Sequence, residues 1–227
     1  MVRWLQRGEN TRYHSELGSE NPQRRWYFVL RHGRVGRCRS LKKQHIIYFS
    51  THPRSSFKKI AMIYLEELTL KNCHLDNYLR WMNDQDVHHF TEQRFKKHSK
   101  SDIKNFVLEK ENSKTEFLYG IFLIKNKAHL GNIKLGPINF QHLTADISYF
   151  IGEKSYWGKG IGTLAIKKII LIAKEKGLKK LKAGSYSTNF ASQKILVKNG
   201  FIKEGILIKE VLLDSKRIDA YSYGKMI

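Results

Sequence analysis

The sequence predicts an α/β (α+β) fold, in which about four helices flank a mixed central sheet of about six to seven strands. From residue 62 onward, apolar residues recur with a period of two, typical of strands, or near 3.6, typical of helices. Closely spaced strand segments come first, and strands separated by helices follow. This order combines antiparallel hairpins with a helical crossover, as a mixed sheet requires.

The first elements are a strand and two helices. Residues 63–68 read as the strand. A helix is expected to open at Asn72, because four apolar residues follow at helical spacing. A second helix is expected over residues 101–111, with Ser101 as its N-terminal cap.

Three strands and the longest helix come next. The strands are expected over residues 117–124, 129–138 and 145–151, and their short polar connections are typical of antiparallel hairpins. The helix is expected over residues 160–176, where apolar residues form one stripe and Gly177 provides the C-terminal stop.

The C-terminal part adds a strand over residues 178–186 and a helix that Asn189 caps and that ends before Gly200. Two strands close the chain, over residues 201–213 and 217–225, joined by a polar turn. The expected order is therefore β-α-α-β-β-β-α-β-α-β-β, without repeats or low-complexity tracts.

The chain is strongly basic, with a formal net charge of +22. Residues 1–61 hold 14 Lys and Arg against 3 Asp and Glu, and residues 62–227 hold 28 against 17, so each part carries +11. The first 61 residues have the higher charge density and no sustained hydrophobic period. We interpret residues 1–61 as a basic N-terminal extension, poorly ordered or not native, in preference to a transit peptide or a nucleic-acid-binding arm. Residues 62–227 are interpreted as the functional domain.

Composition excludes several classes of protein. No apolar run approaches the roughly 20 residues that span a bilayer, so we expect a soluble, cytoplasmic protein without membrane insertion. Cys38 and Cys73 lie far apart, without a CxxC pair or a nearby histidine cluster, so we expect neither a disulfide scaffold nor a metal site. The His88-His89 pair is interpreted as polar surface.

A glycine-rich stretch lies between the strand that ends near Gly152 and the longest helix. Gly158, Gly160 and Gly162 alternate with other residues, and Lys159 adds a cation. The first N–H groups of a helix lack partners within it and attract anions, and glycines let a phosphate approach the backbone. The stretch therefore predicts a phosphate-binding element.

The spacing of these glycines excludes two common phosphate-binding motifs. A dinucleotide motif needs a third glycine at the position of Thr163, and no acidic residue closes a following strand as its ribose ligand. The nucleoside triphosphate loop, GxxxxGK followed by Ser or Thr, is absent.

The strand, the stretch Gly152-Glu-Lys-Ser-Tyr-Trp-Gly-Lys-Gly-Ile-Gly, the following helix and strand, and the pieces Asn189-Phe-Ala-Ser192 and Asn199-Gly200-Phe201 together resemble the GNAT acetyltransferase superfamily. The resemblance is closer to its RimJ/RimL-like branch, and it covers residues 62–227. It implies acetyl-coenzyme A as the co-substrate, no metal, and transfer of an acetyl group to an amine.

The resemblance also implies roles for particular residues. The backbone of Phe150, Ile151 and Gly152 would pair with the pantetheine arm, which Asn189 and Ser192 would also reach. The amides of a six-residue loop would hold the pyrophosphate: Trp157, Gly158, Lys159, Gly160, Ile161 and Gly162. Trp157 stands where the family commonly has Gln or Arg, which costs little because main-chain amides bind the phosphates.

Acyl transfer to an amine needs a base, an oxyanion donor and a partner for the departing thiolate. The resemblance points to the Ile151 amide for the oxyanion. Asp146 and Glu153 are the candidate bases, acting directly or through water, and Asp146 is preferred. Many family members place a tyrosine at the position of Leu196 to serve the thiolate, so Ser192 is the remaining candidate there.

The acceptor is the least predictable part. Our leading class is a small-molecule amine, such as an amino sugar linked to a nucleotide, and the alternatives are a protein N-terminus or the amine of an antibiotic. We also consider a function of another class, that of a catalytically silent coenzyme A-binding protein or of a nucleic-acid-binding protein. Nucleic acid is not the expected partner, and a monomer or homodimer is expected. Several aromatic residues and one histidine are candidates to line the acceptor side: Tyr78, Trp81, His88, Phe90, Tyr221 and Tyr223.

Overall fold

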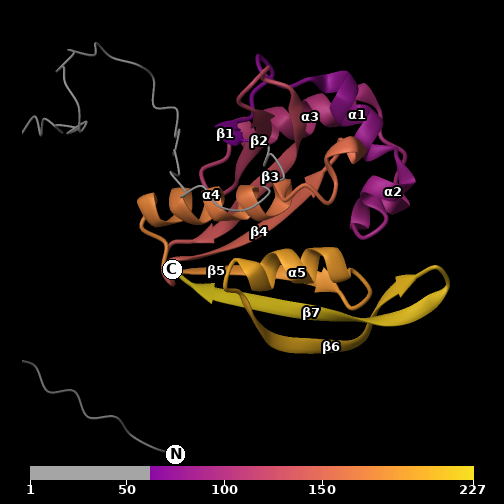
Figure 1. Ribbon diagram of the computed structural model, residues 1–227, viewed down its shortest axis with the longest axis vertical. Coiled ribbons are helices and arrows are strands. Elements are labelled where there is room, and N and C mark those ends of the chain that lie inside the picture. The colour runs from indigo at the N-terminus through magenta and orange to yellow at the C-terminus, as the bar shows by residue number, and fades with distance from the viewer. Residues whose placement is uncertain (1–61) are drawn as a thin grey trace, which may run out of the picture. The chain divides into compact units, whose positions relative to one another are not determined.

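Seven strands form one mixed sheet, as the alternation of apolar residues predicts. The computed structural model describes residues 62–227 (Figure 1). In spatial order the strands are β1 (Ile63–Glu67), β2 (Phe117–Leu123), β3 (His129–Asn139), β4 (Thr144–Ile151), β5 (Lys180–Tyr186), β7 (Lys216–Met226) and β6 (Ile202–Leu213). All neighbours pair antiparallel except β4 and β5, which are parallel. The predicted fold class is confirmed, and the predicted extension, residues 1–61, lies outside the described residues.

Helices cover both faces of this sheet. They are α1 (Leu75–Met82), α2 (Gln85–His88), α3 (Lys100–Glu111), α4 (Ile161–Glu175) and α5 (Phe190–Lys198), with short 3-10 helices η1 (Glu92–Phe95) and η2 (Lys154–Tyr156). The sequence predicted four of the five α-helices. It missed α2, whose single turn is too short to show a helical period. None of the helices in residues 62–227 is long and apolar enough to cross a membrane.

Two helices begin at other residues than predicted. Ser99, not Ser101, caps α3: its hydroxyl accepts from the Asp102 N–H, and the Asp102 carboxylate accepts from the Ser99 N–H in return. This capping box satisfies two otherwise unpaired donors. Helix α1 begins after His74, because the Asn72 side chain instead accepts from the Thr69 N–H at 2.8 Å and closes a turn.

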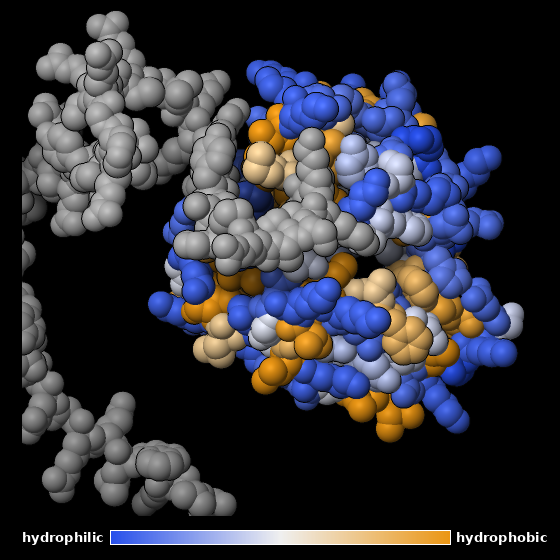
Figure 2. All heavy atoms as spheres, in the orientation of Figure 1, coloured by the Kyte–Doolittle hydropathy of each residue, from blue (hydrophilic) through white to orange (hydrophobic). Residues whose placement is uncertain are grey.

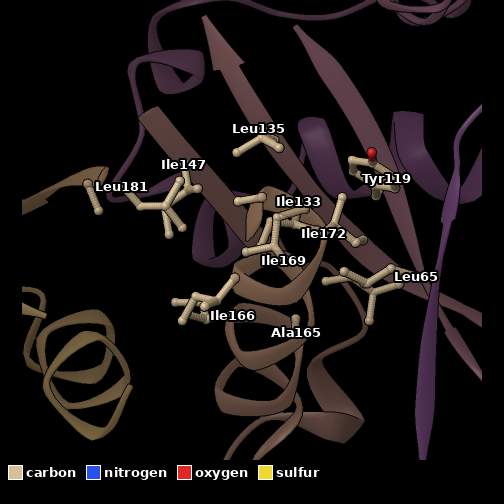
Figure 3. Packing of buried hydrophobic residues seen from close by; sticks show 14 of the residues in the cluster. Leu65, Tyr119, Ile133, Leu135, Ile147, Ala165, Ile166, Ile169, Ile172 and Leu181 are labelled. Carbon is tan, nitrogen blue, oxygen red and sulfur yellow. The ribbon is translucent and has the colours of Figure 1, made fainter. Parts of the chain in front are cut away.

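The apolar stripe of α4 packs on one face of the sheet (Figure 3). Ala165, Ile166 and Ile169 are fully buried in one cluster with Ile133 of β3 and Ile147 of β4. Each fully buried isoleucine side chain contributes roughly 1.5–3 kcal/mol by leaving water. This packing fixes where α4 begins relative to the end of β4.

A second apolar cluster lies on the opposite face, beneath α1 and α3. Trp81 of α1 and Val107 of α3 are buried there with Leu118 and Phe122 of β2, and Phe150 of β4 packs against them. Since β2 contributes side chains to both clusters, it is buried on both faces.

The sheet splits between β4 and β5. The parallel pairing covers only Thr144, Ala145 and Asp146 of β4, whereas β4 continues to Ile151 and β5 to Tyr186. Figure 1 shows α4 and α5 on either side of this split. In the same orientation the molecular surface is indented beside α5 (Figure 2). Within residues 62–227, the C-terminal half of β4 therefore has a free edge on its β5 side.

Candidate functional site

The free edge of β4 presents backbone groups toward the split. The Gly152 N–H, directly after β4, donates to the Leu130 carbonyl oxygen at 2.9 Å. Because the hydrogen-bonding direction alternates along an antiparallel strand, the N–H of Ile151 points the opposite way, into the split. The Ile151 carbonyl oxygen accepts from the Trp157 indole Nε1 at 2.7 Å. Within residues 62–227, the Ile151 N–H has no partner.

Gly152 is required at the end of β4 by close packing. A Cβ at this position would lie 2.1 Å from the Trp81 ring, so the fully buried indole lies directly against the backbone. The Gly152 N–H donates to the Leu130 carbonyl oxygen. The N–H that faces the split is therefore that of Ile151. The Trp81 ring thus fixes the distance between α1 and the end of β4.

The turn into α4 leaves a row of N–H groups unbonded. The N–H groups of Trp157 and Lys159 donate to carbonyl oxygens of η2. Those of Gly158 and of residues 160–163 have no partner in the described chain, and no side chain caps α4. Unpaired donors at the positive end of a helix dipole form an anion-binding site.

The conformation of this turn depends on its glycines. Gly160, the N-cap of α4, has φ +81°, and Gly158 has φ +71°, both in the left-handed region. A Cβ at either position would meet no atom of residues 62–227 within 4 Å, so this part of the chain leaves the surface beside the unpaired N–H groups open. This open surface fits the phosphate groups of a coenzyme.

The first turn of α5 lies across the split from β4. Asn189 caps this helix as predicted, because its Oδ1 accepts from the Ser192 N–H at 3.1 Å. The Ser192 Oγ lies 3.0 Å from the hydroxyl of Tyr149 of β4. Burial raises the pKa of Tyr149 to about 12, so this phenol stays protonated at neutral pH. Leu196, at the family's usual tyrosine position, is fully buried.

The two carboxylates that the sequence singled out lie at opposite ends of the split. Asp146 forms the last pair between β4 and β5, is about half exposed, and contacts the Lys182 Nζ through one oxygen at 3.3 Å. Glu153 follows β4 directly. Both of its oxygens have partners, the Arg80 guanidinium at 3.0 Å and the Ser155 hydroxyl at 3.3 Å.

A segment from α1 to η1 links the two sides of the split. On the β4 side, Lys154 bonds Asp84 at 2.8 Å and Asp86 at 2.9 Å. On the β5 side, the Tyr186 hydroxyl accepts from Arg94 at 2.7 Å and donates to Glu92. These polar contacts attach the segment to both sides of the split, at the C-terminal ends of β4 and β5.

Most candidates for the acceptor side belong to the core instead. Tyr78, Trp81, His88 and Tyr223 are each less than 10% exposed, whereas Phe90 and Tyr221 are partly buried. The interpretation of His88 as polar surface is wrong: α2 packs its last turn inward and leaves this side chain 8% exposed. His89 stays at the surface, 3.6 Å from the Asp214 carboxylate.

The sequence reasoning missed three residues of this region, Tyr149, Lys182 and Arg80. Period-two alternation places Tyr149 on the same face as Ile151, which is the signal that could have drawn attention to it. Lys182 and Arg80 are partners of the two carboxylates from distant elements, and spacing along the chain does not reveal such pairs. Among residues 62–227, no three His, Cys, Asp or Glu side chains gather as metal ligands would.

A free strand edge, a row of unbonded N–H groups and a hydroxyl pair thus surround one split in the sheet. Comparison with known proteins gives this arrangement a context. A family model described as "Acetyltransferase (GNAT) domain" matches residues 63–202. A probable N-acetyltransferase of Bacillus subtilis, YjcK, is 37% identical over 101 residues, or 44% of this chain. The match spans 55% of the length of that relative.

Solved structures of acetyltransferases share the fold. Spermidine N-acetyltransferase from Vibrio cholerae, in complex with CoA and spermine, has a TM-score of 0.65 at 17% identity and covers 72% of this chain and 95% of its own. RimL, a ribosomal L7/L12 alpha-N-protein acetyltransferase in complex with coenzyme A, has a TM-score of 0.64 at 16% identity, with coverages of 73% and 94%. At these identities the likeness concerns the fold.

Proposed function

The chain belongs to the GNAT acetyltransferase family, and on this premise we propose that it transfers the acetyl group of acetyl-coenzyme A to a primary amine. The row of unbonded N–H groups beside the free edge of β4 is the observation that carries the proposal. The N–H groups of Gly158 and of residues 160–163 hold the pyrophosphate, and Lys159 adds positive charge. The Asn189 side chain reaches the pantetheine arm beside the free edge of β4.

The proposed reaction needs no nucleophile from the protein. The amine nitrogen attacks the thioester carbon, the C–N bond forms, and the C–S bond breaks with its electron pair on sulfur. The nitrogen loses one proton and the sulfur gains one, so the products are an amide and a thiol. Ile151 donates its free N–H to the carbonyl oxygen as negative charge develops there.

We assign the base to Asp146, because one of its carboxylate oxygens has no partner in the described chain, whereas both oxygens of Glu153 do. Asp146 lies five residues from Ile151, roughly 17 Å along the strand, which is too far for direct contact or one bridging water, so the proton must reach it through a chain of several waters. Glu153 instead ties the end of β4 to α1 through Arg80. Ser192 donates a hydrogen bond to the departing sulfur. Leu196, at the family's usual tyrosine position, has no polar group for this role.

For the acceptor, we propose a small-molecule amine, with an amino sugar linked to a nucleotide as the leading class. A protein N-terminus is the alternative, in keeping with a place in the RimJ/RimL-like branch. Enzymes of similar fold act on both kinds of amine, a polyamine in one case and a protein N-terminus in the other. The net charge of +11 on residues 62–227 favours acceptors that carry phosphate.

Calorimetry with a matched pair of variants tests the coenzyme site. Gly160→Ala and Gly177→Ala both add a Cβ where φ is +81° and +80°, with open space around it, so both strain the backbone equally. Only Gly160 borders the proposed phosphate site. We expect Gly160→Ala to weaken acetyl-coenzyme A binding about tenfold, which is 1.4 kcal/mol, and Gly177→Ala to leave it unchanged. Absence of binding by the unmodified protein would refute the proposed function.

A screen of amine classes with acetyl-coenzyme A identifies the acceptor. The thiol released in each reaction is measured against amino sugars, their nucleotide-linked forms, polyamines and peptides with free N-termini. The pH–rate profile of Asp146→Asn with the best acceptor tests the base: loss of the acidic limb supports Asp146, and an unchanged profile excludes it.

A further inference from the structure

Tyr149 and Ser192 form a hydroxyl pair that bridges the split in the sheet. Tyr149 projects from the unpaired half of β4, and Ser192 lies in the first turn of α5, with 3.0 Å between their oxygens. The Tyr149 ring also lies close to the start of α4, since a Cβ on Gly162 would be 3.6 Å from it. The pair therefore lies where β4, α4 and α5 meet.

The two hydroxyl groups carry one hydrogen more than their mutual contact uses. Each hydroxyl carries one hydrogen, and the contact between them uses one of the two. Neither hydroxyl has another hydrogen-bond partner within residues 62–227. One hydroxyl hydrogen therefore remains for a third acceptor.

The surroundings indicate which acceptor this is. Ile151, two residues after Tyr149, faces the split with its free N–H, and Asn189 begins the helical turn that contains Ser192. Both residues line the path proposed for the pantetheine arm. The N-terminal turn of a helix also carries partial positive charge, which favours negative charge on a nearby sulfur.

We propose that Tyr149 is a positioning residue: it donates its hydrogen to the Ser192 oxygen and so directs the Ser192 hydrogen to the sulfur of coenzyme A. The inference rests on the proposed function, because it needs coenzyme A in the split. Tyr149 stays protonated throughout, and Ser192 gives a hydrogen bond without giving up its proton. The sulfur receives its final proton from the one that the amine loses.

The thiol of bound coenzyme A gives a readout that a structural role would not move. A hydrogen bond from Ser192 stabilises the thiolate and lowers the pKa of the bound thiol. Ultraviolet absorbance of the thiolate is followed against pH for the complex of each variant. We expect Tyr149→Phe and Ser192→Ala both to shift this titration to higher pH, whereas Ser192→Thr, which keeps a hydroxyl, stays near the original.

Turnover supplies the second readout. We expect Tyr149→Phe to lower kcat about fivefold to tenfold, with less than about a twofold change in the KM for acetyl-coenzyme A. The double variant with Ser192→Ala should lose no more than Ser192→Ala alone, because Tyr149 acts through Ser192. Tyr119→Phe is the matched control: this buried tyrosine bonds Glu67 of β1, and its loss should change neither measurement.

The outcomes separate the two proposals. If the unmodified protein fails to bind coenzyme A in calorimetry, the proposed function fails and this inference fails with it. If coenzyme A binds but the thiol titrates at the same pH in the unmodified protein and in Tyr149→Phe, Tyr149 has no positioning role and the proposed function stands. Additive losses of kcat in the double variant would likewise overturn the inference.

Discussion

His129 shows how a single buried residue couples the fold to pH. Its side chain is 3% exposed on the α1 face of β3, and its Nε2 lies 2.7 Å from the Asn132 Oδ1. The Trp81 ring lies 5.0 Å from the imidazole, between centroids. Burial in these surroundings lowers the pKa of His129 to about 4, so the folded protein holds a neutral imidazole.

Acidification should therefore destabilise the protein through His129. Between about pH 6.5 and pH 4 the unfolded chain binds a proton that the folded chain does not, so the free energy of unfolding falls as pH falls. The full loss, reached near pH 4, is about 3 kcal/mol. Urea unfolding of the unmodified protein and of His129→Gln at pH 7 and pH 4.5 measures it, because glutamine removes the titration. A stability difference between the two that stays constant with pH would contradict this account.

Individual residues were predictable where chemistry acts locally. Asn189 was identified as a cap because its side chain serves the next helical turn, and the glycine-rich turn was recognised from its spacing. Tyr149 was missed because alternation gives the face of a residue but not what it meets across a split. Likewise, the burial of His88 depends on how α2 packs, which the local pattern does not contain.

The cap of α3 illustrates the same limit at the scale of an element. Both Ser99 and Ser101 precede a helical pattern, and only the structure shows that Ser99 bonds the Asp102 N–H. We expect Ser99→Ala to lower the free energy of unfolding by about 1 kcal/mol. Ser101→Ala, the control two residues later, removes only the contact of its hydroxyl with the Ser99 hydroxyl at 2.8 Å and should change it by less than about 0.5 kcal/mol. Urea unfolding at neutral pH compares the two, and equal losses would argue against the capping box.

Strands and long helices were predicted because each has a period that its own residues reveal. The seven strands and four of the five α-helices appear at nearly the expected residues. Helix α2 and η1 escaped prediction because they are single turns held by partners from distant elements. Arg94 of η1, for example, bonds Tyr186 of β5 and the Leu212 carbonyl of β6.

The hydrophobic pattern of the sequence did not predict the spatial order of the strands in the sheet. Strand β7 lies between β5 and β6, which places an earlier strand at the edge of the sheet. The hydrophobic period of these strands is compatible with several orders, because it reports burial and not neighbours. The split is a feature of the same scale: β4 and β5 pair over only three residues, and α4 and α5 lie on either side of the part that does not pair.

Residues 62–227 should fold and bind the coenzyme without residues 1–61. We propose that residues 62–227 form the acetyltransferase domain, since both apolar clusters and all proposed site residues lie within them. A protein that starts at Met62 should then unfold at nearly the same temperature as the full chain and bind acetyl-coenzyme A within about twofold, which is 0.4 kcal/mol. Calorimetry and thermal unfolding of both proteins measure this. Failure of the shorter protein to bind would assign residues 1–61 to the domain.

The same pair of proteins tests the competing nucleic-acid hypothesis. Removing residues 1–61 lowers the formal net charge from +22 to +11 and removes the segment of highest charge density. If that segment is a nucleic-acid-binding arm, the full chain binds RNA or DNA with a steep dependence on salt, and the shorter protein loses this binding. If both proteins elute from a nucleic-acid column at the same salt concentration, residues 1–61 are not such an arm. The basic charge of residues 62–227 then serves the phosphates of the coenzyme, and acetyl-coenzyme A affinity should fall as salt rises in both proteins alike.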